Sequence, residues 1–220
     1  MPIDMIFPGI SMGVFQARFW CEQQKRSIFA VGRRNLEEKT VAILEREFSM
    51  LVGSERSERA APVWFVTMET WPEIQAGLPK PARAFAAACG FEPTPGRCQI
   101  LPDAKGKIAG VLFGIEAADA CVRDLFLPGQ LATSLPCGVY HFANRPHDAA
   151  LATLSWLLSG YRFQRYKTNG GDPPRLCVPE GVNAARVERV AKGVALGRDL
   201  INTPANDMDP DALEAAAFSF

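Results

Sequence analysis

The chain has 220 residues, a formal net charge of zero and 48% hydrophobic residues. This length predicts one or two domains, and the hydrophobic content is sufficient for a buried core. The balanced charge gives no electrostatic argument for binding nucleic acid or a membrane surface. No apolar run approaches the roughly 20 residues that are needed to span a bilayer. We therefore expect a globular protein that has neither nucleic acid nor a membrane as a partner.

The cysteines are distributed singly and indicate a reducing compartment. They are Cys21, Cys89, Cys98, Cys121, Cys137 and Cys177. Because there is no Cys-x-x-Cys pair and no signal peptide of ordinary form, we expect reduced thiols in a cytoplasmic protein. Cys89 and Cys98 could instead pair or bind a metal, but isolated buried thiols are commoner.

Residues 1–58 are predicted to be an N-terminal extension. Residues 29–32 could form a short strand, and residues 36–51 have apolar positions at helical spacing. Residues 53–59 are polar and predict a linker. Two hypotheses remain open for the extension: it is a genuine part of the protein, or it results from a start site that was assigned too early.

Residues 59–167 are predicted to form an α/β domain. The expected strands lie at residues 62–67, 99–101, 108–114 and 138–142, and the expected helices at 71–89, 117–127 and 149–161. The first helix is broken at Pro79 and Pro81, and Asp103 begins a hairpin turn. Strands that alternate with helices indicate a mixed sheet flanked by helices. A linker with a short strand at 176–178 is expected over residues 168–182.

A long helix is predicted to begin at Asn183 and to end near Asn202, before Pro204. Its apolar residues fall at helical spacing, on a side that we expect to be buried: they are Val187, Val190, Ala191, Val194 and Ile201. Asp209 and Pro210 predict the cap and first residue of another helix. The last residues, up to Phe220, suggest a core that is not completed, so we expect residues from about 203 onwards to be mobile.

Few residues suggest a binding or catalytic centre. His141 and His147 are six apart, whereas a metal pair on a helix would be three or four apart, so a satisfied structural His141 is the better interpretation. Helix capping accounts better than a calcium loop for a group of close carboxylates, which are Asp207, Asp209 and Asp211. The segment from Gly110 to Gly114 lacks the Lys-Ser/Thr of a phosphate loop.

Aromatic and basic residues alternate between Tyr161 and Lys167 (Tyr-Arg-Phe-Gln-Arg-Tyr-Lys). Such alternation occurs on nucleic-acid-binding surfaces. In a chain of zero net charge, we favour aromatic packing with solvated charges.

Three segments resemble the leucyl (cytosol) aminopeptidase family. Residues 198–208 (Arg-Asp-Leu-Ile-Asn-Thr-Pro-Ala-Asn-Asp-Met) resemble the opening of its catalytic domain. Residues 156–167 resemble the segment that closes its N-terminal domain, and residues 101–114 resemble the N-terminal domain of a bacterial branch. The resemblance covers about residues 61–217 and is most specific at Asn-Thr-Pro-Ala-Asn-Asp-Met.

The resemblance implies a small α/β domain, similar in topology to macro domains, that leads into a larger catalytic domain. The larger domain uses two divalent metal ions, zinc or manganese, to activate water and to hold the free amino terminus of a peptide. Hexamers are usual in the family. Their contacts come largely from the larger domain, so a hexamer is doubtful for this chain.

The segments that supply the family's metal ligands and catalytic residues have no counterpart in this sequence. Gly106-Lys107-Ile108 lacks the following Asp of the Gly-Lys-Gly-x-x-x-Asp type, and Asn202-Thr203 is followed by Pro-Ala-Asn rather than Asp-Ala-Glu. We therefore assign no catalytic, cofactor-binding or metal-ligating residue to this chain.

The first hypothesis is a truncated family member in which residues 183–220 begin an incomplete catalytic domain. The full-length form would release N-terminal amino acids from peptides, and this chain itself would be inactive. The alternative is a free-standing, non-catalytic α/β module that binds a ligand or partner. An exposed apolar side on the helix over residues 187–201 would favour the first hypothesis, whereas a covered one would favour the second.

Overall fold

The computed structural model describes residues 50–53, 60–166 and 171–219. The strands are β1 (Leu51–Val52), β2 (Ala61–Val66), β3 (Cys98–Pro102), β4 (Ile108–Gly114), β5 (Val139–Phe142) and β6 (Arg175–Cys177). The helices are α2 (Trp71–Gly77), α3 (Lys80–Ala88), the short 3₁₀ helix η2 (Leu127–Gln130), α4 (Leu131–Ser134), α5 (Ala149–Gly160), α6 (Ala184–Asn202) and α7 (Pro210–Ser219). The predicted strand at 29–32 and most of the predicted helix at 36–51 lie outside the described residues.

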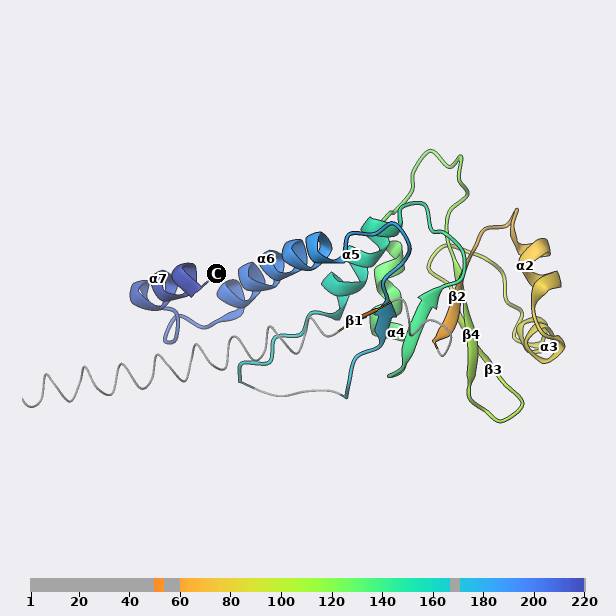
Figure 1. The fold of residues 1–220 in the computed structure, drawn as a ribbon, viewed down its shortest axis with the longest axis horizontal. Helices are drawn as coiled ribbons and strands as arrows, with labels where there is room; N and C mark the ends of the chain where they lie inside the picture. The colour runs from red at the N-terminus through yellow and green to blue at the C-terminus, as the bar shows by residue number, and fades with distance from the viewer. Residues whose placement is uncertain (1–49, 54–59, 167–170, 220) are drawn as a thin grey trace, which may run out of the picture. The chain divides into compact units, whose positions relative to one another are not determined.

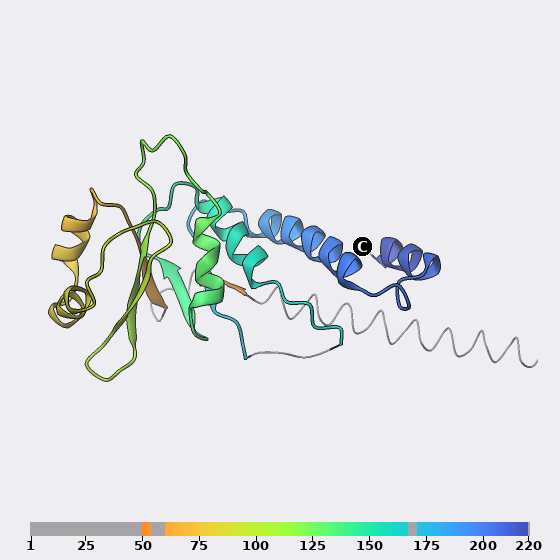
Figure 2. The ribbon, with the colours of Figure 1, turned by 180° about the vertical axis from the view of Figure 1, so that it is seen from behind.

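Within the described residues, the strands form one six-stranded sheet in the order β1-β6-β5-β2-β4-β3. All neighbours are parallel except β3 and β4, which form the antiparallel hairpin that the sequence predicts. Figures 1 and 2 show α2 and α3 on one side of this sheet and α4, α5 and α6 on the other. The expectation of a mixed sheet flanked by helices is confirmed.

Strand β2 supplies side chains to both faces of the sheet. Val63 and Phe65 belong to the larger hydrophobic cluster, under α4 and α5, whereas Val66 belongs to a second cluster under α2 and α3, with Trp64 packed against it. This separation follows from the two-residue period of a strand, which sends successive side chains to opposite faces. Both faces therefore need a covering layer of helices.

The larger cluster is centred on Trp156 of α5, which is fully buried. Its indole Nε1 donates a hydrogen bond to the Pro174 carbonyl oxygen at 3.3 Å. The Phe65 and Phe142 rings meet edge to face with centroids 4.9 Å apart. Asp148 caps the start of α5 by accepting from the Leu151 amide.

The second cluster packs α2 and α3 against Val66 and Leu112. The two helices are separate because the chain is broken before Lys80, as the prolines predict. Gly90 follows α3 with a φ of +57°, a conformation that glycine adopts without the cost that a Cβ would add.

The helix predicted over residues 117–127 is wrong. Residues 115–126 form turns and bends, which make the long loop at the top of Figure 1, and only Leu127 enters a 3₁₀ helix. Arg123 donates to the Ala118 carbonyl oxygen, and the Asp124 side chain accepts from the Phe126 amide. Such local hydrogen bonds compete with helix formation. A helix here would also bury little, since Val122 is 85% exposed.

The predicted buried side of α6 is partly wrong. Val187 and Ala191 are buried as expected, together with Ala195, but Val190, Val194 and Ile201 are 45%, 37% and 84% exposed. The buried residues are spaced by four, which is a narrow strip. A helix with so narrow a buried strip packs against one neighbouring helix, here α5. A helix that is fully embedded buries a wider part of its circumference.

Helix α6 begins and ends as its sequence signals indicate. Asn183 caps α6 by accepting from the Arg186 amide at 3.0 Å, and α6 ends at Asn202. By contrast, Leu51 lies in β1 and pairs with Leu176 of β6. The helix predicted over 36–51 therefore does not include its last residue.

We predict that Gly114→Ala destabilises the fold, because a Cβ at this position would overlap the carbonyl oxygen of Thr94. Forced overlap with backbone typically costs about 1–3 kcal/mol. Gly77→Ala is the matched control, since a Cβ there has open space and alanine favours helix. Urea unfolding should show a lower midpoint for the first variant only. Equal midpoints for the two variants would contradict the prediction.

Candidate functional site

A dense group of polar side-chain contacts lies where α5 ends beside α6. We call this region the joint; it consists of residues 158–166 and 198–207. Arg198 of α6 donates from Nη1 to the Leu158 carbonyl oxygen at 2.6 Å. Its guanidinium carbon lies 5.2 Å from the centroid of the Tyr161 ring. A cation at this position complements the partial negative charge at the carboxyl end of α5.

Tyr161 links the end of α5 to the last turn of α6. Its hydroxyl donates to Asp199 Oδ1 at 2.6 Å and accepts from Asn202 Nδ2 at 3.2 Å. The Thr203 hydroxyl donates to the Asp199 carbonyl oxygen at 2.6 Å, and Arg165 Nη1 donates to that hydroxyl at 3.4 Å. The joint therefore has a continuous set of hydrogen bonds across segments that are 38 to 41 residues apart.

Asp199 is half-buried in this network, and its pKa is raised above the ordinary value of 3.8. Burial is the largest cause, because it disfavours the charged carboxylate. The hydrogen bond from Tyr161 and the positive charge of Arg165 act in the opposite direction. The carboxylate is thus held by its partners in a place that solvates it poorly.

A small cavity lies beside the joint. Met50, which precedes β1, lines it together with residues at the end of α5 and on α6, among them Gly160, Tyr161, Ala195 and Arg198. Its volume of about 10 Å³ corresponds to roughly one water molecule. This cavity is too small for a peptide or a nucleotide, so the joint has the features of a structural connection.

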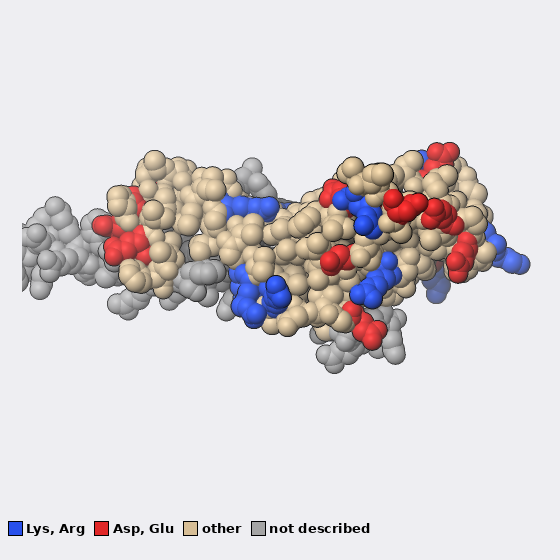
Figure 3. All heavy atoms as spheres, turned by 90° about the horizontal axis from the view of Figure 1, so that it is seen from above, with Lys and Arg blue, Asp and Glu red and all other residues tan. Residues whose placement is uncertain are grey.

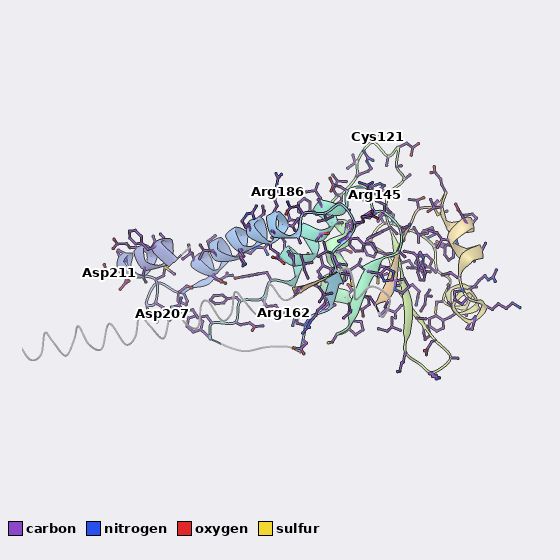
Figure 4. The ribbon with its side chains drawn as sticks, in the orientation of Figure 1. Cys121, Arg145, Arg162, Arg186, Asp207 and Asp211 are labelled. Atoms are coloured by element: carbon purple, nitrogen blue, oxygen red, sulfur yellow. The ribbon has the colours of Figure 1, made fainter. Side chains whose placement is uncertain are left out.

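The described residues do not fit the metal centre that the resemblance implies for the larger domain. Across residues 50–53, 60–166 and 171–219, no group of three or more His, Cys, Asp or Glu side chains could hold a metal ion. Asp207 accepts from Tyr166, and Asp209 caps α7 by accepting from the Ala212 amide at 2.7 Å. Figure 4 shows Asp207 in the turn before α7 and Asp211 on α7.

The two histidines have different surroundings. His147 Nε2 forms a hydrogen bond with the Glu116 carbonyl oxygen at 2.9 Å. His141 Nδ1 is buried and has no hydrogen-bond partner in the described part of the chain, so the expectation of a satisfied His141 is wrong. Its register partner on β2 is Pro62, whose ring offers neither a donor nor an acceptor.

The five described cysteines are free thiols. Cys89 and Cys98 therefore do not pair with each other. Burial raises the pKa of Cys98 to about 11, which keeps this thiol protonated and unreactive at neutral pH. Cys89, Cys121 and Cys137 are exposed.

The alternating aromatic and basic residues after Tyr161 pack within the chain. The Phe163 and Tyr166 rings meet with centroids 5.8 Å apart, and the Arg165 guanidinium lies 5.9 Å from the Tyr166 ring. Figure 3 shows both signs of charge on the face that it presents. The aromatic packing that the sequence favours is thus present, although Lys167 lies outside the described residues.

The fold defines an α/β domain with a mixed sheet, from which the long helix α6 extends to one side (Figure 1). A model for the "M17 aminopeptidase, N-terminal domain" matches residues 63–179, just over half of the chain. The chain therefore belongs to the M17 aminopeptidase family, which confirms the resemblance found in the sequence.

Two curated relatives support this assignment. The probable cytosol aminopeptidase of Afipia carboxidovorans is 37% identical over 91 residues, which cover 36% of this chain and 17% of the relative. That of Methylorubrum extorquens is 39% identical over 80 residues, which cover 32% of this chain and 16% of the relative. The match therefore spans about a sixth of each curated relative.

A solved structure has the same fold. The crystal structure of the cytosol aminopeptidase from Coxiella burnetii aligns with a TM-score of 0.64 and 25% identity. The alignment covers 77% of this chain and 36% of that chain.

Among the residues that the structure describes, no helix is long and apolar enough to cross a bilayer.

The raised pKa of Asp199 predicts a pH-dependent stability. A raised carboxyl pKa contributes stability that is fully present below pH 3.8, the ordinary value, and that is lost as the pH rises through the raised pKa. Asp199→Asn removes this titration while it keeps an oxygen that can accept from Tyr161. Urea unfolding across this pH window should show that the wild type loses stability relative to the variant.

Tyr161→Phe is the informative comparison for this titration. It removes a hydrogen bond that lowers the pKa of Asp199, so the loss of stability with rising pH should become larger. Parallel pH profiles for the wild type and Asp199→Asn would show that the Asp199 carboxyl titrates alike in the folded and unfolded states.

The cysteine environments predict an order of thiol reactivity. At pH 8, iodoacetamide should modify Cys98 more slowly than Cys89 and Cys121, because the Cys98 thiolate is scarce and the side chain is shielded. Mass spectrometry of tryptic peptides measures the three rates. In urea the difference should disappear, and a fast reaction of Cys98 in the folded protein would contradict its burial.

Proposed function

We propose that this chain is the N-terminal part of an M17-family aminopeptidase whose full-length form releases N-terminal amino acids from peptides by two-metal hydrolysis. In this proposal, the 220 residues contain no hydrolytic centre of their own. Their role is to present α6 and the joint to the larger domain that carries the metal ions.

The exposed side of α6 is the observation that carries the proposal. Val187, Ala191 and Ala195 bury one side of the helix against the α/β core, whereas Val190, Val194 and Ile201 on α6 remain exposed. Large apolar side chains gathered on one exposed helix face mark a surface that is covered in the working protein. This favours the aminopeptidase hypothesis over a free-standing module.

The distribution of carboxylates supports the second part of the proposal. A two-metal centre needs several clustered ligands to bridge its ions. The described carboxylates near the joint are used in other ways: Asp199 and Asp207 accept from tyrosines, and Asp209 caps a helix. When bound elsewhere in a full-length protein, zinc or manganese would supply the activated water.

Peptide substrates and a cytoplasmic location belong to the same proposal. Both are supported by the names of the relatives, which are cytosol aminopeptidases. The joint and the single cavity described beside it offer no peptide-sized site. Substrate contacts are therefore assigned to the larger domain.

A chimera tests the proposal directly. The portion of the Coxiella burnetii enzyme that aligns with this chain is replaced by this chain, and release of leucine from an unblocked peptide is measured with manganese or zinc present. We expect the chimera to be active. Val194→Glu and Ile201→Glu should each lower its activity about tenfold or more, because an unpaired charge is costly to bury.

Val122→Glu is the matched control, since Val122 is also an exposed valine, at 85%, but lies in the loop before η2. It should leave the activity of the chimera unchanged. A folded but inactive chimera, or equal effects of all three variants, would favour the free-standing module. Hydrolysis by the 220-residue chain alone would contradict the absence of a hydrolytic centre.

A further inference from the structure

Residues 161–166 form hydrogen bonds to the end of α6 and to the turn between α6 and α7. We infer that Tyr161, Arg165 and Tyr166 form a clasp that holds residues 199–207 and so sets the direction in which α7 leaves α6. This clasp is a conformational device of the described residues. It does not depend on the proposed peptidase function.

Apolar burial cannot hold this end of the chain. The last buried apolar residue of α6 is Ala195, and beyond it Ile201, Leu213 and Phe218 are 84%, 50% and 84% exposed. Thr203, which is 7% exposed, is polar. With so little apolar area removed from water, polar contacts must provide most of the local stability.

The first point of the clasp is Tyr161. Its hydroxyl bridges Asp199 and Asn202, at 2.6 and 3.2 Å, and so fixes the last turn of α6. A hydrogen bond to a carboxylate is stronger than one between neutral groups. Tyr161 itself directly follows α5, a helix that is anchored in the core through Trp156.

The second point lies beyond the break at Pro204. There the Tyr166 hydroxyl donates to Asp207 Oδ2 at 2.5 Å. Arg165 contributes on the near side of the proline, where its Nη1 donates to the Thr203 hydroxyl at 3.4 Å. The two points thus stand on either side of the proline, where the helix cannot continue. A segment held on both sides of a break has little freedom to swing about it.

The inference opposes the expectation, drawn from the sequence, that residues from about 203 are mobile. The backbone hydrogen bonds that would protect them are defined. Thr203 donates to the Asp199 carbonyl, Asp207 to that of Pro204 and Leu213 to that of Asp209. Amide exchange at these three residues therefore decides between the two expectations.

The experiment measures hydrogen–deuterium exchange by NMR on the whole 220-residue chain. In the double variant Tyr161→Phe with Tyr166→Phe, we expect exchange at Thr203 and Asp207 to be about tenfold faster, since each lost hydrogen bond contributes modestly to local stability. Exchange at amides of β2 and β4 should change less than exchange at Thr203 and Asp207, because the clasp lies outside the core. Tyr140→Phe is the matched control: its hydroxyl donates to Pro136 at a distant site, and its loss should leave these two amides unaffected.

Tyr166→Phe alone keeps the inference testable if the double variant folds poorly, because Tyr166 is 54% exposed and packs outside the core. It should speed exchange at Asp207 more than at amides within α5. Unchanged exchange in both tyrosine variants would overturn the clasp. Wild-type exchange of Thr203, Asp207 and Leu213 at the rate of an unstructured peptide would overturn it as well.

Discussion

The pairing of β2 on both of its edges is the constraint on which the fold depends. Its parallel registers with β4 and β5 place Val63 and Phe65 over one face and Trp64 and Val66 over the other. A parallel strand that is apolar on both faces has to be covered on both. The two helical layers follow from this requirement, and so does the position of α5, whose Trp156 packs under the centre of the sheet.

The sequence predicted most elements because their signals are local. The β2 run, the hairpin, the proline break before α3 and the cap at Asn183 each depend on a few adjacent residues. The loop at 115–126 was predicted to be a helix because its alanine-rich composition is typical of helices. The segment has no apolar face that a helix could bury against the core. In α6 the helical spacing of the apolar residues predicted the right element. The width of its buried side depends on how many elements pack against the helix, which its own sequence does not contain.

The joint could not be predicted in detail, because its partners are far apart in the chain. Tyr161 meets Asp199 across 38 residues, and Tyr166 meets Asp207 across 41. Polar pairs of this kind have no periodic signal, and the sequence had assigned Asp207 to helix capping together with Asp209 and Asp211. The structure separates their roles: Asp209 is a cap, whereas Asp207 and Asp199 accept hydrogen bonds from tyrosines.

Small residues on α5 and α6 make these polar contacts geometrically possible. Gly160, Ala191 and Ala195 line the same cavity as Arg198, and a Cβ at Gly160 would overlap the Met50 side chain. Larger residues here would push α6 away from α5, and Arg198 would no longer reach the Leu158 carbonyl. The hydrogen-bond network therefore depends on the close packing of α5 against α6. The small side chains set the distance between the helices, and the polar side chains hold the end of α6 where packing alone cannot.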